Sequence, residues 1–149
     1  MKNMMEFCYK ALLIFGLLGL STSTMARDDL LSFDFDEVLQ RGYSEGILDE
    51  NITFKLVGQK HKAVIKKFSN YRTNKKTRRL GKPEVESCAW ALLTALKTLQ
   101  ARAHSLNANA IINIKSNYKN REFSSSTEYQ CGSGFIMAGV ALKADVVNL

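Results

Sequence analysis

Proline, histidine and cysteine are scarce in this chain of 149 residues, which contains one proline, two histidines and three cysteines. A single proline, no long low-complexity tract and 46% hydrophobic residues argue against a disordered chain. Beyond residue 26 the soft metal ligands are His61, His104, Cys88 and Cys131, whose spacing matches neither Cys-x-x-Cys nor His-Glu-x-x-His. We therefore expect no metal site and no cofactor.

Motifs of known enzymes are missing as well. A phosphate-binding P-loop needs Gly-x-x-x-x-Gly-Lys-Ser/Thr, but the one Gly-Lys pair, Gly81-Lys82, is followed by Pro83 and has Lys76 at the place of the first glycine. Ser, His and Asp occur without the glycine signature of a nucleophile elbow. The sequence therefore predicts a protein that is not an enzyme, with an enzyme of unrecognised type or a metal-binding protein as the alternative.

No apolar run reaches the roughly 20 residues that a membrane-spanning helix needs. One run of ten, Ala11 to Leu20, follows Lys2 and Lys10 and precedes the small residues around Ala26. This order is that of a secretory signal peptide over residues 1–26, and we predict cleavage after Ala26. The alternative is an uncleaved anchor. After cleavage no transmembrane segment remains, so we expect a soluble periplasmic or secreted protein made of residues 27–149.

Cys88 and Cys131 are the two cysteines that remain after this cleavage. An oxidising compartment favours a disulfide bond between them. In the chain-entropy model such a bond contributes roughly 4 kcal/mol, a large share of the stability of a small domain. The alternative is a pair of separate buried thiols.

The clearest secondary-structure signal is an amphipathic helix from Pro83 to about Leu106. Pro83 suits the first helical position, and Asn107 is suited to the left-handed conformation that ends a helix. The apolar stripe, widened by Trp90 and Leu93, predicts packing against a sheet or, in a homo-oligomer, against another subunit through the face of residues 84–106. The stripe consists of Val85, Ala89, Leu92, Leu96, Leu99, Ala103 and Leu106.

Short strands are expected on both sides of this helix. Alternating residues at 52–57 and 63–68 predict two strands that form a hairpin, preceded by a short helix capped by Ser32 or Asp34. Behind the long helix we expect strands at 110–115, near 128–131 and at 135–142, the last a central apolar strand. These elements predict the α+β class: a single small domain with an antiparallel or mixed sheet packed against one long amphipathic helix.

Positive charge is the strongest chemical signal in a chain whose formal net charge is +7. Residues 60–82 contain ten Lys and Arg residues and no Asp or Glu, with the aromatic residues Phe68 and Tyr71 among them. Arginine offers bidentate contacts to phosphate, and aromatic rings offer stacking surfaces. The segment therefore predicts a polyanion-binding surface for lipopolysaccharide, anionic lipid, an acidic protein or, less readily, nucleic acid; the alternative is a solvated loop. The candidates are Lys66, Lys67, Arg72, Lys75, Lys76, Arg78, Arg79 and Lys82.

The segments Cys88–Leu93, Leu99–Tyr118, Tyr129–Cys131 and Gly139–Lys143 resemble a small secreted proteobacterial family. The resemblance extends from about Arg27 to the end of the chain. Members of this family often carry the label excinuclease ATPase subunit, which implies nucleotide hydrolysis. Because this chain has no P-loop, we expect neither ATPase nor excinuclease activity.

Residues 84 to 143 are also similar, more weakly, to two other groups. One is a small bacterial domain family described as heavy-metal-binding and thought to form ring oligomers; this resemblance implies no defined ligand set. The other is the Rcs envelope-stress sensor lipoprotein, which implies a bridge between Cys88 and Cys131. This chain lacks the lipid-anchor cysteine and the second cysteine pair of that sensor.

Overall fold

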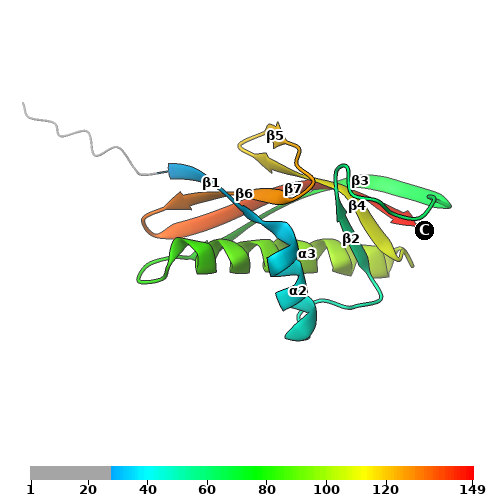
Figure 1. Cartoon of the computed structure of the whole chain (residues 1–149), viewed down its shortest axis with the longest axis horizontal. Coiled ribbons are helices and arrows are strands. Elements are labelled where there is room, and N and C mark those ends of the chain that lie inside the picture. Colours follow the sequence, from blue (N-terminus) through cyan, green and yellow to red (C-terminus); the bar gives the residue numbers. More distant parts are fainter. Residues whose placement is uncertain (1–27) are drawn as a thin grey trace, which may run out of the picture.

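Seven strands and two helices form one domain in the computed structural model, which describes residues 28–149. The predicted signal peptide lies outside the described residues. Both helices cover the same face of a single mixed sheet (Figure 1), so the α+β class is confirmed. The elements are β1 (Asp28–Asp34), α2 (Phe35–Ser44), β2 (Thr53–Leu56), β3 (Lys66–Arg78), α3 (Glu84–Ser105), β4 (Ala110–Tyr118), β5 (Arg121–Phe123), β6 (Glu128–Gly134) and β7 (Met137–Asn148).

Strand β7 is the centre of the sheet. It pairs along its whole length with β3 on one side, and on the other side it pairs first with β6 and then with β4. Strand β1 extends the sheet beyond β6, β2 lies parallel to β4, and β5 forms a hairpin with β4. The prediction of a central apolar C-terminal strand is confirmed, although the strand covers Met137–Asn148 instead of 135–142.

The predicted hairpin of residues 52–57 and 63–68 is wrong. Strand β2 pairs in parallel with β4, whereas β3 begins at Lys66 and pairs with β7. Phe54 and Leu56 are 2% exposed and join the core beside Ile111 and Ile114 of β4. Alternation shows that a strand has one buried face, but it does not show which strand lies beside it.

Helix α3 packs its apolar face against the sheet of its own chain. Leu92, Leu93 and Leu96 are completely buried there. Pro83 is the N-cap with an extended backbone instead of the first helical residue, and Asn107 takes the predicted left-handed conformation with φ of 52°. The stripe was predicted too wide, because Val85 is 56% and Trp90 is 37% exposed. The predicted homo-oligomer through residues 84–106 stays a prediction.

The prediction of one helix on the sheet is also wrong, because α2 packs beside α3. Asp34 caps α2, accepting a hydrogen bond from the backbone nitrogen of Glu37 at 2.8 Å. Arg41 of α2 donates two hydrogen bonds to the Glu86 carboxylate, at 2.9 and 3.0 Å, and lies over the Trp90 ring. These hydrogen bonds from Arg41 hold the pKa of Glu86 below its ordinary value. Trp90 is therefore part of a contact between the helices, outside the core.

The predicted disulfide ties α3 to β6. Cys88 and Cys131 are bonded with their Cα atoms 5.8 Å apart, and both residues are fully buried. In the part of the chain that the structure describes, no helix is both long and apolar enough to cross a bilayer.

Candidate anion-binding groove on the open face of the sheet

Most of the basic segment is a strand at the edge of the sheet. Residues 66–78 form β3, so the alternative of a solvated loop is wrong for this part of the segment. Within residues 28–149, β3 pairs only with β7, which leaves its outer edge unpaired. Lysine and arginine side chains along such an edge also discourage pairing with other chains. Side chains of a strand alternate between the two faces, so β3 divides its cations between the helix side and the open side.

The side chains of β3 that face α3 have structural roles. The Tyr71 hydroxyl accepts a hydrogen bond of 2.6 Å from Arg102 of α3, whose guanidinium lies 4.6 Å from the Tyr71 ring centroid. Thr77 donates to the Ser87 carbonyl at 2.9 Å, and Thr73 is buried. By the same alternation, the partly exposed Lys75 also belongs to this face.

The open side of the sheet is faced by the alternate residues of β3, which are Asn70, Arg72, Asn74, Lys76 and Arg78. Asn70 shows this orientation directly, because its amide donates to the carboxylate of Asp145, also on the open face, at 3.0 Å. All five side chains are exposed. Three of the predicted polyanion-binding cations therefore share the open face.

The other candidates from the sequence lie elsewhere or already have partners. Lys67 forms an ion pair of 3.0 Å with Asp145, and Lys66 lies over the Phe68 ring. Arg79 pairs with Glu84 at 2.9 Å and donates to the Gly134 carbonyl at 2.5 Å. Lys82 lies in the loop before α3. Lys66 and Arg78 are at opposite ends of a strand roughly 40 Å long, so one small ligand does not reach all the candidates.

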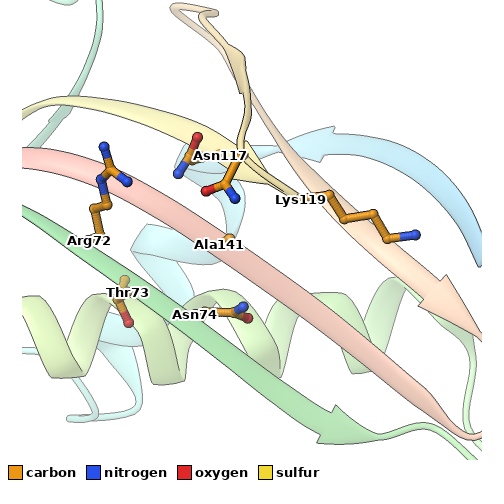
Figure 2. Close-up of a pocket in the computed structure, with 7 residues that line it drawn as sticks. Arg72, Thr73, Asn74, Asn117, Lys119 and Ala141 are labelled. Carbon is orange, nitrogen blue, oxygen red and sulfur yellow. The ribbon is translucent and has the colours of Figure 1, made fainter.

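A groove crosses the open face between β3 and the β4–β5 turn. One hollow of about 290 Å³ is lined by Arg72 and Asn74 on one side and by Asn117, Lys119 and Asn120 on the other, with Ala141 of β7 beneath. In Figure 2, Arg72 of β3 and Asn117 of β4 lie on the same side of β7, whereas Thr73 points toward α3.

A second hollow of about 470 Å³ adjoins the first at Lys119. It extends past Lys76, Tyr118 and Gly139 to the β6–β7 turn. We call the two hollows together the open-face groove.

Small residues make the floor of this groove. A methyl group added at Gly132 would lie 2.0 Å from Cζ of Tyr118, so the tyrosine ring rests directly on the glycine.

The Tyr118 hydroxyl donates to Asp28 at 2.8 Å, and Lys119 pairs with the same carboxylate. These two hydrogen bonds hold the pKa of Asp28 below its ordinary value, while burial and then Asp28 raise the pKa of Tyr118 to about 12.

The wall formed by the β4–β5 turn was not predicted from the sequence. Lys119 and Asn120 both have positive φ, at 51° and 60°, and form a tight two-residue turn without the usual glycine. The one available signal was the repetition of Ser69-Asn-Tyr-Arg72 at Ser116-Asn-Tyr-Lys119. The structure brings the cations of both segments, Arg72 and Lys119, to the same hollow.

Three carboxylates of the open face, those of Glu122, Asp145 and Asp28, already hold cations. Hydrogen bonds from Lys115 at 2.7 Å and Lys143 at 2.6 Å lower the pKa of Glu122 to about 2. Asp145 and Asp28 are paired as described above. By contrast, no ion pair or hydrogen bond within residues 28–149 engages the side chains of Arg72, Lys76 and Arg78, although the charge of Lys76 also helps to lower the pKa of Asp28. The groove is therefore bordered by more positive than negative charge, and it suits an anion.

The two histidines that the sequence offers as metal ligands make other contacts in the structure. His61 contacts the Lys62 carbonyl at 2.7 Å, and His104 lies 3.4 Å from Asp49. Over residues 28–149, no three His, Cys, Asp or Glu side chains gather closely enough to hold a metal ion.

Comparison with known proteins adds no relative: no family model matches the chain, and neither the curated proteins nor the solved structures yield a significant match. The resemblances read from the sequence therefore stay predictions.

Proposed function

We propose that this protein is a non-enzymatic envelope domain that binds a phosphorylated polyanion in the open-face groove. The observation that carries the proposal is the position of Arg72 and Lys76: neither makes an ion pair or a hydrogen bond within residues 28–149, and both border a groove whose floor contains glycine and alanine. The disulfide supports a location in an oxidising compartment.

The chemistry of the groove favours phosphate groups. Arginine donates two parallel hydrogen bonds to a phosphate, and the amides of Asn74, Asn117 and Asn120 offer further neutral donors. The small residues of β7 let a ligand approach the sheet closely.

The spacing of the cations favours a repeating anion over a single phosphate. Arg72 and Lys76 are four residues apart on one face of a strand, which places them roughly 13 Å apart, and Arg78 lies about 7 Å further along. A single phosphate does not contact both of the first two residues. In the envelope, the phosphorylated saccharides of lipopolysaccharide and the lipid headgroups of a membrane carry such repeating charge.

The test is binding of inorganic polyphosphate to an Arg72→Ser/Lys76→Ser variant. The matched control is Lys60→Ser/Lys62→Ser, which removes the same charge from the exposed loop before β3. We expect the groove variant to bind about tenfold or more weakly, with the slope of log affinity against log salt smaller by about 1.4.

The control is expected to stay close to wild type, and both variants should keep the wild-type melting temperature because all four side chains are exposed. Equal losses in the two variants would show that only net charge matters and would reject the groove as the site.

A further inference from the structure

One end of the molecule exposes a cluster of large apolar side chains. The turn between β6 and β7 exposes the side chains of Phe135, Ile136 and Met137, by 70%, 57% and 41%. Leu80, in the loop that follows β3, is 48% exposed. Leu80 and Phe135 line a common hollow of about 420 Å³, so the two segments form one surface. We call Leu80, Phe135, Ile136 and Met137 the apolar tip.

Two backbone carbonyls at the turn beside the apolar tip accept hydrogen bonds from Arg79. The backbone nitrogen of Arg79 donates to the Ile136 carbonyl at 2.6 Å, and the Arg79 side chain donates to the Gly134 carbonyl at 2.5 Å. Unpaired backbone carbonyls are the main cost of placing a turn in an apolar medium. Arg79, proposed from the sequence as an anion ligand, thus holds two carbonyls of this turn.

Cations surround the apolar tip. Arg78 pairs across the sheet with Met137, Lys82 lines the hollow that holds Leu80 and Phe135, and Lys76 lines the groove that ends at the turn. The nearby carboxylates are engaged, Glu84 by Arg79 and Asp28 by Lys119. The end of the molecule therefore combines exposed apolar side chains with an excess of positive charge.

We propose that the apolar tip docks on an anionic lipid bilayer. Phe135, Ile136 and Leu80 enter the boundary between headgroups and acyl chains, while Arg78 and Lys82 contact the lipid phosphates. This is the combination of apolar insertion and electrostatic attraction that holds peripheral proteins on membranes. An anionic lipid surface fits this end of the molecule, because the residues around the apolar tip are cationic and the tip itself is formed by two turns that project apolar side chains. The inference shares the cations Lys76 and Arg78 with the open-face groove, but it rests on the exposed apolar side chains, which the proposed function does not use.

The opposite end of β3 provides a matched control. Val64 and Ile65 are 43% and 80% exposed in the loop before the strand, and Lys62, Lys66 and Lys67 flank them. This site has a comparable composition, but its two apolar side chains come from a single loop segment. Replacing them removes exposed hydrophobic surface without touching the apolar tip.

The experiment is sedimentation with lipid vesicles of phosphatidylcholine containing one quarter phosphatidylglycerol. The wild-type protein and its variants are purified after any processing by the cell. Mass spectrometry identifies the first residue of each, so that proteins with the same first residue are compared. We expect Phe135→Ser/Ile136→Ser to lower vesicle binding about 100-fold, roughly tenfold for each side chain. Val64→Ser/Ile65→Ser should change binding less than threefold, and Arg78→Ser/Lys82→Ser should abolish the preference for phosphatidylglycerol over pure phosphatidylcholine.

Three results would overturn the inference. The first is no binding of the wild-type protein to these vesicles. The second is an equal loss in the Val64→Ser/Ile65→Ser control, which would indicate unspecific adsorption. The third is an assembly of the wild-type protein that Phe135→Ser/Ile136→Ser converts to monomers, since the tip would then be covered by a second copy. Binding of soluble polyphosphate by Phe135→Ser/Ile136→Ser should equal that of wild type, so this test and that of the open-face groove fail independently.

Discussion

Removal of the disulfide should cost this domain a large part of its stability. Cys88 and Cys131 are fully buried and lie 43 residues apart in the sequence. The bond joins α3 to β6, so it links the helix layer to the sheet directly. The perturbation we consider is the pair of substitutions Cys88→Ala and Cys131→Ala, alone and together.

The magnitude follows from the length of the closed loop. In the chain-entropy model, a loop of this length restricts the unfolded chain by about 4 kcal/mol. The whole free energy of unfolding of a small domain is typically about 5–15 kcal/mol. We therefore expect the double variant to lose about 4 kcal/mol and its melting temperature to fall by roughly 15–30 °C.

Urea denaturation measures this loss. Each single variant breaks the same bond as the double variant, so all three should agree within about 1 kcal/mol. Wild-type protein that is unfolded and refolded in reductant should follow the curve of the double variant. A total loss below about 1 kcal/mol, or single losses that add in the double variant, would refute the reasoning, because the cysteines would then act as two independent buried groups.

Two further predictions concern the open face of the sheet. Burial opposes the charge of Asp145, but hydrogen bonds from Asn113, Asn70 and Lys67 outweigh this effect and lower the pKa of the carboxyl. The contribution of Asp145 to the free energy of unfolding is therefore present above about pH 4 and is lost as the pH falls further. Asp145→Asn should cost about 1–3 kcal/mol at pH 7 and flatten the acid branch of a stability curve measured in urea; unchanged stability at pH 7 would contradict this role. Gly132→Ala should push the Tyr118 ring off the sheet and break its hydrogen bond to Asp28. A phenolate titration followed by ultraviolet absorbance should then show the Tyr118 pKa falling from about 12 toward its ordinary value. The control is Gly139→Ala, because a methyl group added there lies no closer than 3.4 Å to its nearest neighbour. An unchanged titration in Gly132→Ala would show that the ring does not depend on this glycine.

Local patterns were sufficient for several elements of the fold. The helix over Glu84–Ser105 follows from a repeat of apolar residues at helical spacing, and Asn107 ends it as expected. Asp34 was one of two candidate caps for α2 and makes the capping hydrogen bond. The central position of β7 follows from its nearly continuous apolar run. Each of these signals depends on residues that are near one another in the sequence.

The pairing of strands and the role of each cation were decided by the tertiary structure alone. Alternation identified β2 and β3 as strands, but their partners β4 and β7 lie far along the chain. The ten cations of residues 60–82 look alike in the sequence. Arg79 became a structural residue because the fold places Glu84 and the Gly134 carbonyl beside it. Arg72 makes no ion pair with another described residue, and three carboxylates of its face, those of Asp145, Asp28 and Glu122, hold lysines instead. Hydrogen bonds and ion pairs act over a few ångströms in space, so only the folded chain determines which charges are neutralised and which remain to bind a ligand.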